Sequence, residues 1–239
     1  MKLEDKIVTV TGAGNGVGRA VALEALRRGA RVAGVDISAH GLEETAGLAA
    51  AGDRFASYVV DITDKAAVSE LPATIAERFG AVDGLVHLAA IIQPFLKVKD
   101  LDDAAIERVF AVNWWGTLHL NRAFLPVLLD RPEAHIVNTS SMGGFIPVPG
   151  QTIYGASKAA VKLLTEALRA ECRGTPVRVT VVIPGGMATN MPANSGVSIA
   201  VDPEQVLIGR DAKLMDLFYR VNPSGAAALI ARQMKGLVA

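Results

Sequence analysis

The chain of 239 residues is poor in several features, and each absence narrows what it can be. It has a single cysteine, Cys172, so no disulfide can form within the chain, and a reducing compartment is expected. Its 24 basic side chains are balanced by 24 acidic ones, which leaves no positive surplus for a nucleic acid or an anionic membrane. No apolar run reaches the roughly 18 residues of a membrane span, and the charged opening MKLEDKIVTV is unlike a signal peptide. A cytoplasmic protein without nucleic-acid or membrane partners is therefore expected.

Apolar residues are abundant, at 51% of the chain, and they occur in short runs that alternate with longer helical stretches. Six short runs predict strands, at residues 6–11, 31–36, 55–61, 84–89, 135–140 and 177–183. Amphipathic or alanine-rich segments between them predict helices at residues 17–28, 39–51, 65–79, 101–129 and 154–172. The strands are apolar throughout rather than alternating, which is typical of a parallel sheet covered on both faces. The sequence therefore predicts a doubly wound α/β fold with helices on both faces of a parallel sheet.

One domain spanning residues 1–239 is expected, because no linker or change in composition interrupts the chain before Pro184. Beyond that residue turn formers predominate, so residues 185–222 predict a substrate loop or lid that leads into a helix. Helical patterns cover residues 205–220 and 225–235, and the final GLVA could begin a short last strand.

Four glycines lie within the eight residues TGAGNGVG (11–18), directly after the first predicted strand. Gly12, Gly16 and Gly18 form the pattern G-x-x-x-G-x-G, whereas the commoner G-x-G-x-x-G would require glycine at Val17. A glycine-rich turn between a strand and a helix lets a diphosphate approach the free N–H groups of the helix N-terminus. The alternative is that these glycines serve only tight packing.

Asp36 ends the second predicted strand, 18 positions after Gly18, close to the roughly 20 expected for an acid that binds a nucleotide ribose. Its charge would repel a 2′-phosphate, and Arg31 lies at the other end of the strand, roughly 16 Å away. The pattern therefore favours NAD over NADP. The alternative role, capping the next helix, is better filled by Ser38.

Tyr154 and Lys158 are four residues apart and hence share one face of a predicted helix. A tyrosine with a pKa of about 10 is a poor base at neutral pH, and an adjacent ammonium lowers that pKa by roughly one to three units after desolvation is allowed for. The pair alone is also compatible with a chance surface pair. The pair becomes a candidate catalytic pair because its helix directly follows a predicted strand that ends in Ser140 and Ser141.

Taken together, these motifs resemble those of the short-chain dehydrogenase/reductase superfamily over about residues 3–190. The matching segments are TGAGNGVG (11–18), VNWWG (112–116), YGASK (154–158) and IPGGMATN (183–190). Ser141 lies 13 residues before Tyr154, the step that the family's serine takes. The resemblance implies a Rossmann fold, a three-layer sandwich in a single domain.

The resemblance also implies a role for each matching residue. Tyr154 would be the acid/base, and Lys158 would lower its pKa and hold the nicotinamide ribose. Ser141 would hydrogen-bond the substrate oxygen, and Asn113 would hold a water that links Lys158 to solvent. The NAD contacts implied in this way, together with the turn and Asp36, are Gly12, Asn15, Gly16, Val17, Gly18, Asp36, Ile37, Asp61, Ile62, Ala89, Ala90, Tyr154, Lys158, Pro184, Gly185, Met187 and Thr189.

One segment departs from the family pattern, because His87-Leu88-Ala89-Ala90 stands where N-N-A-G is usual. The missing asparagine removes a side chain that normally ties the sheet centre together, and Ala90 adds a methyl group beside the cofactor. A catalytic or metal role for His87 is weighed against a hydrogen-bonded core residue, and the core residue is favoured. The remaining histidines, at positions 40, 119 and 135, lack metal-like spacing, so no metal site is expected.

The expected substrate pocket is lined by residues 92–95, 143–148 and 187–199, which are mostly apolar and include no lysine or arginine. An uncharged, mainly apolar secondary alcohol or ketone is therefore expected. The helices that carry Trp114, Trp115, Leu118, Val161, Leu164 and Leu168 look more apolar than one face needs. The resemblance implies that they form a subunit interface, so a homodimer or homotetramer is expected; the alternative is packing within the chain only.

The sequence thus predicts an NAD-dependent alcohol dehydrogenase or carbonyl reductase in which Tyr154 is the acid/base. One alternative is a 3-oxoacyl thioester reductase, although that activity in this family usually goes with NADPH, against Asp36. Another is a catalytically idle NAD-binding or scaffold protein, which the altered segment at His87 would suit. The presence of Asn113, Ser141, Tyr154 and Lys158 together argues against the idle protein.

Overall fold

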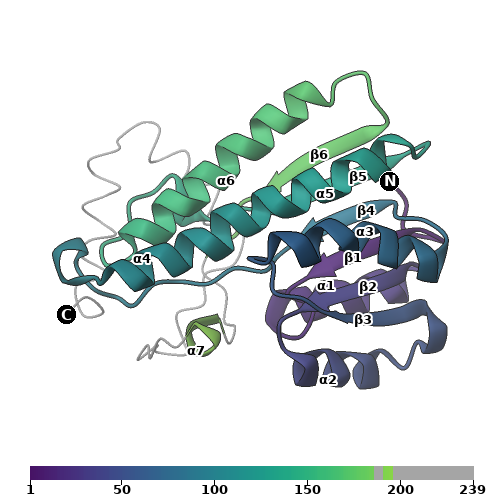
Figure 1. Cartoon of the computed structure of the whole chain (residues 1–239), viewed down its shortest axis with the longest axis horizontal. Helices are drawn as coiled ribbons and strands as arrows, with labels where there is room; N and C mark the ends of the chain where they lie inside the picture. Colours follow the sequence, from purple (N-terminus) through teal and green to yellow (C-terminus); the bar gives the residue numbers. More distant parts are fainter. Residues whose placement is uncertain (186–190, 196–239) are drawn as a thin grey trace. The chain divides into compact units, whose positions relative to one another are not determined.

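The computed structural model describes residues 1–185 and 191–195, coloured by position in the sequence in Figure 1. Packing within the chain groups the residues into two compact units. The first unit consists of Met1–Ala90, Trp115–Asn138 and Thr165–Thr180. The second unit consists of Ile91–Trp114, Thr139–Leu164 and, among the described residues beyond β6, 181–185 and 191–195. The single domain predicted for residues 1–239 remains a prediction.

Most of the predicted loop or lid at 185–222 lies outside the described residues, as do the predicted helices at 205–220 and 225–235 and the final GLVA. Of that loop the structure describes Gly185 and residues 191–195, where Met191–Asn194 form the four-residue helix α7. Among the described residues, no helix is both long and apolar enough to cross a membrane.

A six-stranded sheet in the order β3-β2-β1-β4-β5-β6 forms the scaffold. The strands are β1 (Ile7–Thr11), β2 (Arg31–Asp36), β3 (Phe55–Val59), β4 (Gly84–His87), β5 (Ala134–Thr139) and β6 (Val177–Val182). Parallel pairing joins β1 to both β2 and β4, β2 to β3, and β4 to β5, with Val8 opposite both Val32 and Gly84. The six predicted strands are confirmed, although β3 and β4 each end two residues earlier than predicted.

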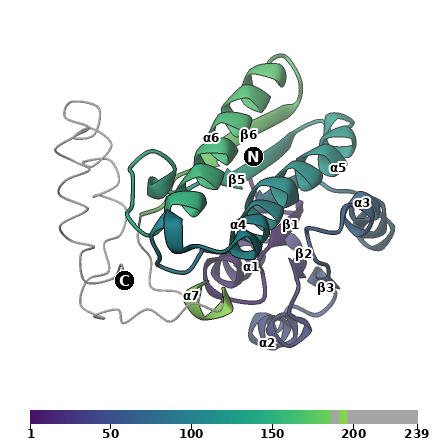
Figure 2. The same cartoon turned by 60° about the vertical axis from the view of Figure 1, so that its left-hand side comes forward.

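The helices are α1 (Gly16–Arg27), α2 (Ala39–Ala49), α3 (Lys65–Phe79), α4 (Asp103–Phe110), α5 (Thr117–Leu129), α6 (Thr152–Glu171) and α7. From β1 the chain first adds β2 and β3 on one side and then returns to add β4, β5 and β6 on the other side. Because crossovers between parallel strands are right-handed, α1 and α2 lie on one face of the sheet and α3 and α5 on the other. Contacts between α1 and α2 and between α3 and α5 agree, and Figure 2 shows strands β1 to β3 between α2 and α3. The predicted doubly wound α/β fold is confirmed.

Local sequence explains where these helices start. The side chains of Asn15, Ser38, Asp64 and Asp102 precede α1, α2, α3 and α4, and each accepts a hydrogen bond from a backbone N–H of the first turn. Such capping satisfies donors that have no partner within the helix. The expectation that Ser38 rather than Asp36 caps the second helix is confirmed.

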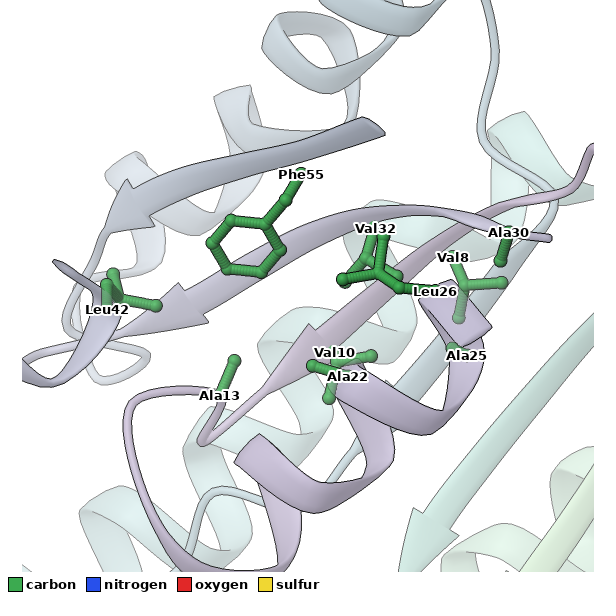
Figure 3. Close-up of a cluster of buried hydrophobic side chains, with 10 residues drawn as sticks. All are labelled: Val8, Val10, Ala13, Ala22, Ala25, Leu26, Ala30, Val32, Leu42 and Phe55. Carbon is green, nitrogen blue, oxygen red and sulfur yellow. The ribbon is translucent and has the colours of Figure 1, made fainter. Parts of the chain in front are cut away.

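A cluster of small and branched side chains fixes the end of β1 against α1. Its buried members are Val8, Val10, Ala13, Ala22, Ala25, Leu26, Ala30, Val32, Leu42 and Phe55 (Figure 3). On β2, a Cβ atom at Gly34 would lie 2.6 Å from the Phe55 ring, so the ring can cover the strand only because Gly34 has no side chain. This packing holds the turn that follows β1, because Ala13 within that turn belongs to the cluster.

The helical stretch predicted for residues 101–129 is found from Asp103 to Leu129, but it is not one uniform α-helix. A π-helical segment, Ala111–Gly116, separates α4 from α5. π-Helical turns admit one extra residue and occur frequently at functional sites. Within the segment Asn113 is fully buried and hydrogen-bonded, while a Cβ at Gly116 would come within 2.6 Å of Ile62. These side-chain demands come from distant parts of the chain, so the apolar periodicity did not reveal the interruption.

Candidate active site

The glycine-rich turn of the first unit depends on the absence of side chains. Gly12 and Gly16 have φ angles of 71° and 50°, in the left-handed region. A Cβ at Gly18 would lie 1.9 Å from the carbonyl oxygen of Gly12, and one at Gly12 would lie 3.2 Å from the nitrogen of Ala89. The turn therefore packs tightly against its own helix and against the residues after β4. No acidic residue occupies the first turn of α1, so no carboxylate there would repel an anion.

Replacing Gly18 with alanine is expected to lower the free energy of unfolding by about 3 kcal/mol, because the backbone must shift to admit the methyl group. Gly47 in α2 is the matched control, since a Cβ there meets nothing within 4 Å. Gly47→Ala should instead raise stability by about 0.5–1 kcal/mol. Urea unfolding of both variants tests this, and equal stability of Gly18→Ala and the wild type would show that the turn has room for a side chain.

Asp36 at the end of β2 is bound to the same turn. Its Oδ2 accepts a hydrogen bond from the Gly14 N–H at 2.9 Å, and its Oδ1 accepts one from the Ser38 N–H at 3.0 Å. A Cβ at Gly14 would lie 2.9 Å from the Asp36 Cγ, so glycine at position 14 lets the carboxylate lie against the turn. The predicted spacing between the glycines and the acid thus brings them into contact.

Sequence reasoning missed Arg19, which connects the turn to α2. Its guanidinium donates to the carbonyl oxygens of Gly14 and Gly41, to Thr45 Oγ1 at 3.0 Å and to Glu44 Oε2 at 2.6 Å. These bonds hold the carbonyl of Gly14 while Asp36 holds the N–H of the same residue. Because the partners lie 5 to 26 residues away, no local pattern marks Arg19 as a support of the turn.

His87 is a core residue, as the favoured interpretation predicted. It is 1% exposed, its Nδ1 lies 2.8 Å from Thr11 Oγ1, and its Nε2 lies 2.9 Å from Thr117 Oγ1. Since Thr11 Oγ1 accepts from the N–H groups of Leu88 and Ala89, its own hydrogen points to Nδ1, and Nε2–H then donates to Thr117. The expectation that this segment loses its tie to the sheet centre was therefore wrong, because the imidazole bridges β1 and α5. Across the described residues, no cluster of His, Cys, Asp or Glu could hold a metal ion.

In the second unit, the structure brings Ser141 and Tyr154 together. Ser141 Oγ accepts a hydrogen bond from the Gly143 N–H at 3.1 Å, and it lies close enough to the Tyr154 phenol to lower the pKa of that group. A Cβ at Gly143 would lie 3.5 Å from the Tyr154 ring and 3.6 Å from Ser141 Oγ, so the glycine lies beside both groups. This hydroxyl pair is the arrangement that the spacing of 13 residues predicted.

Lys158 lies one helical turn beyond Tyr154 and is 2% exposed. Its Nζ donates to the carbonyl oxygen of Thr139 at 3.0 Å, and its own carbonyl oxygen accepts from Ser140 Oγ at 2.7 Å. A Cβ at Gly144 would come within 2.9 Å of the Lys158 carbonyl carbon, so the glycines of MGGF allow the segment after β5 to lie flush against α6.

Burial dominates the ionisation of these two side chains. It raises the pKa of the Tyr154 phenol, and the hydrogen bond with Ser141 opposes it. It lowers the pKa of Lys158 from 10.5 to about 8. The prediction that Lys158 brings the phenol pKa below its ordinary value was therefore wrong for the protein without cofactor, because loss of hydration penalises the phenolate and the ammonium alike.

Asn113 joins three parts of the second unit. Its Oδ1 accepts from the Ile91 N–H at 2.9 Å, and its Nδ2 donates to the Ile91 carbonyl at 2.9 Å and to Ser157 Oγ at 3.0 Å. The side chain thus connects the π-helical segment to the loop after β4 and to α6. The predicted water between Asn113 and Lys158 remains a prediction.

The remaining predicted cofactor residues are placed as follows. Ile37 is exposed after β2, Asp61 is exposed with its Oδ1 bonded to Thr63, and Ile62 is buried. Asn15, Val17, Ala89 and Ala90 are half-buried in the first unit. Pro184, whose carbonyl accepts from the Met142 N–H at 2.9 Å, and Gly185 belong to the second unit. Met187 and Thr189 lie outside the described residues.

Comparison with known proteins agrees with this geometry. The model of a family described as short chain dehydrogenase matches residues 6–198. The 1-deoxy-11-beta-hydroxypentalenate dehydrogenase of Streptomyces avermitilis is 41% identical, over 80% of this chain and 72% of its own.

Two solved structures are similar over most of the chain. A short chain dehydrogenase/reductase from Burkholderia phymatum in complex with NAD is 27% identical with a TM-score of 0.79, over 100% of this chain and 90% of its own. The 3-ketoacyl-(acyl-carrier-protein) reductase from Brucella melitensis complexed with NADH is 30% identical with a TM-score of 0.77, over 80% of each chain. With its doubly wound sheet, its glycine-rich turn and its Ser141–Tyr154 pair, the chain belongs to the short chain dehydrogenase family of oxidoreductases.

Proposed function

We propose that this protein interconverts a secondary alcohol and a ketone with NAD(H) as cofactor. The observation that carries the proposal is that Ser141 and Tyr154 lie together beside Gly143, with the buried amine of Lys158 one helical turn further along α6. Two neighbouring hydroxyl groups can together hold one substrate oxygen, and one of them can exchange a proton with it.

Tyr154 acts on the proton of the substrate oxygen, and Ser141 orients that oxygen. When bound, the nicotinamide supplies the hydride to the carbonyl carbon or takes it up from the alcohol. Because burial raises the pKa of the phenol, Tyr154 is protonated at neutral pH and is ready to donate its proton in ketone reduction. Alcohol oxidation requires the phenolate, so that direction gains from higher pH.

The residues present fit an NAD molecule. The glycines of the turn at Gly12, Gly16 and Gly18, and an N-terminus of α1 without an acidic residue in its first turn, suit a diphosphate. Asp36, held at that turn, suits the hydroxyls of the adenosine ribose. The remaining cofactor contacts that we propose are Asn15, Val17, Ile37, Asp61, Ile62, Ala89, Ala90, Tyr154, Lys158, Pro184, Gly185, Met187 and Thr189. Asp61 and Ile62 would flank the adenine, Lys158 would hold the nicotinamide ribose, and Thr189 would meet the carboxamide.

The preference for NAD over NADP depends on the charge of Asp36. Asp36→Asn keeps an oxygen that can accept from the Gly14 N–H but removes the charge, so we expect the Kd for NADH to rise about 10–100-fold. The affinity for NADPH should fall less than that for NADH, or rise, since the 2′-phosphate is no longer repelled by a charge at position 36. Fluorescence titration with both cofactors measures the ratio, and Asp53→Asn removes a charge at an exposed site as the control. An unchanged ratio in Asp36→Asn would contradict the assignment.

An uncharged, mainly apolar substrate is proposed because residues 92–95, 143–148 and 187–199 contain no lysine or arginine that would hold a carboxylate or phosphate. The experiment is a panel of secondary alcohols with NAD, and of the matching ketones with NADH, followed by absorbance of the reduced cofactor. Turnover of neutral alcohols above anionic ones supports the proposal. Absence of turnover across the panel, with NADH bound, would favour the idle NAD-binding protein instead.

A 3-oxoacyl thioester reductase is the second candidate. The similar enzyme from Brucella melitensis is in complex with NADH, so Asp36 alone is no argument against this activity. Including a 3-oxoacyl thioester in the ketone panel separates the two candidates, since a strong preference for the thioester would replace the simple ketone as the proposed substrate.

A homodimer or homotetramer is also proposed. Of the six apolar residues that predicted an interface, Val161 and Leu168 are buried within the chain and cannot contribute, whereas Trp115 is 51% exposed. Leu163 on α6 is 69% exposed, so α6 also offers an exposed apolar side chain that could contribute to an interface. Light scattering coupled to size exclusion tests the assembly, and a Trp115→Glu variant that stays oligomeric would show that the π-helical segment before α5 lies outside the interface.

A further inference from the structure

Gln93 lies in the loop that follows β4, and its side chain is 0% exposed. Both ends of its carboxamide are hydrogen-bonded. Its Nε2 donates to the carbonyl oxygen of Gly150 at 3.1 Å. Its Oε1 accepts from the backbone N–H groups of Ile153 at 2.7 Å and of Tyr154 at 2.9 Å. All of these residues belong to the second unit.

The two N–H groups that donate to the Gln93 Oε1 atom are in the first turn of α6, which begins at Thr152. The first four N–H groups of a helix have no acceptor within the helix, and a side chain directly before the helix usually provides one. Here Gln151 occupies that place, but its Nε2 donates to the backbone carbonyl oxygen of Gln93 at 2.8 Å. The cap for α6 therefore comes from a residue 60 and 61 positions away in the chain.

We propose that Gln93 is a positioning residue for the acid/base, holding the backbone of Tyr154 so that its phenol meets Ser141. This inference rests on the proposed function, in which Tyr154 exchanges a proton with the substrate. It adds to that function a residue that never needs to touch the substrate, since its side chain is buried and bonded to the helix.

Geometry argues for positioning beyond general stabilisation. Ser141 is held separately, through the Gly143 N–H, so the distance between the two hydroxyl groups depends on where the first turn of α6 begins. Without the Gln93 oxygen, two partly buried N–H groups would lose their acceptor, and the first turn would open to reach water. Tyr154 would then move while Ser141 stays in place. Misplacement of a catalytic group by about 1 Å can cost about 100-fold in rate.

The neutrality of the carboxamide also matters. A glutamate at position 93 would accept the same two N–H groups, but it would lose the donor to Gly150 and add a negative charge near the phenol. A leucine would fill similar space and accept neither N–H group. These two variants therefore perturb Tyr154 in opposite ways, one by charge and the other by exposure.

The test is a spectrophotometric titration of the tyrosines, which number three in the chain. The difference between wild type and Tyr154→Phe assigns the Tyr154 phenol. Since burial raises the pKa of that phenol, we expect its midpoint to fall by at least half a unit in Gln93→Leu, because the loosened turn admits water. In Gln93→Glu the midpoint should rise instead, because the carboxylate opposes formation of the phenolate.

The matched control is Gln151→Leu, which removes the other buried amide between the loop and α6 but leaves both N–H groups capped. It should lower the melting temperature without moving the Tyr154 midpoint. In steady-state assays, Gln93→Leu should lower kcat by about 10–100-fold while the Kd for NADH stays within about twofold, since misplacement acts on the proton transfer.

The possible outcomes separate this inference from the proposed function. If the wild type turns over no alcohol or ketone, the proposed function fails, yet the titration still shows whether Gln93 controls the environment of Tyr154. If Gln93→Leu does not fold, the upward midpoint in Gln93→Glu decides. The inference would be overturned if the Tyr154 midpoint in both Gln93→Leu and Gln93→Glu equalled the wild-type value. It would also be overturned if Gln151→Leu shifted that midpoint as much as Gln93→Leu does.

Discussion

Replacing Tyr154 with phenylalanine is expected to lower kcat for alcohol oxidation and ketone reduction by about 10²–10⁴-fold, the usual contribution of a positioned general acid or base. Phenylalanine keeps the ring beside Gly143 and loses only the hydroxyl group, so the fold and the NADH affinity should be retained. Steady-state kinetics in both directions, with NADH titration and thermal unfolding of the same sample, checks all three statements.

Tyr58→Phe is the control for this experiment. Tyr58 is a half-buried residue of β3 in the first unit, and its hydroxyl is not part of the proposed site. Its replacement should leave kcat within about twofold of wild type, because it removes no group that acts on the substrate. Undiminished turnover in Tyr154→Phe would mean that another group handles the proton, and the proposed mechanism would have to be abandoned.

Replacing Lys158 with methionine is expected to stabilise the protein without cofactor while abolishing turnover. The pKa of Lys158 is about 8 in the folded protein and 10.5 ordinarily, a gap that corresponds to about 3 kcal/mol of unfavourable free energy when the amine is charged. Methionine removes this cost but leaves the Thr139 carbonyl without its donor, a loss of about 1 kcal/mol. The net gain at pH 7 is about 2 kcal/mol, or roughly 4–8 °C in melting temperature for a chain of this size.

The pH dependence of that gain identifies its cause. Below pH 8 the amine is charged in both the folded and the unfolded protein, so the folded state bears the full cost of burying it. Between about 8 and 10.5 the folded protein binds fewer protons than the unfolded one, so wild-type stability rises with pH. The advantage of Lys158→Met should therefore shrink across this range. Lys65→Met, at an exposed position of α3, provides the control and should show no such trend.

A Lys158→Met variant that is less stable than wild type at pH 7 would show that the amine gains more from its surroundings than burial costs it. The same measurement with saturating NADH is informative, because a ligand that binds only the folded state adds stability to whichever variant still binds it. A smaller NADH-dependent rise in Lys158→Met than in wild type would assign Lys158 to the cofactor.

Several features could be read from the sequence because their causes are local. The strands follow from continuous apolar runs such as IVTV, and the start of α2 follows from Ser38 in the capping position. The glycines of the turn, Asp36 and the Y-x-x-x-K pair are likewise visible as short patterns. Their spacing also predicted which of them lie together, since Gly14 contacts Asp36 and Ser141 lies beside Tyr154.

Other features could not be read, because their causes lie between distant residues. The break between α4 and α5 depends on Asn113 and its bonds to Ile91 and Ser157, residues 22 and 44 positions away. The bridge from His87 to Thr11 and Thr117 spans 76 and 30 positions. The family pattern has asparagine at position 87, so the sequence did not show that the His87 imidazole joins β1 to α5. The imidazole can do this because one ring nitrogen accepts a hydrogen bond and the other donates one.

By itself, the sequence determined the alternation of strands and helices, the position of the glycine-rich turn and the identity of the groups that can move a proton. Only the tertiary structure decided that burial raises the pKa of Tyr154 and that Gln93 caps the helix carrying it. The physical reason is that hydrophobic periodicity and turn chemistry act over a few neighbouring residues. Hydration and hydrogen-bond partners of a buried group are set instead by whichever segments the fold packs around it.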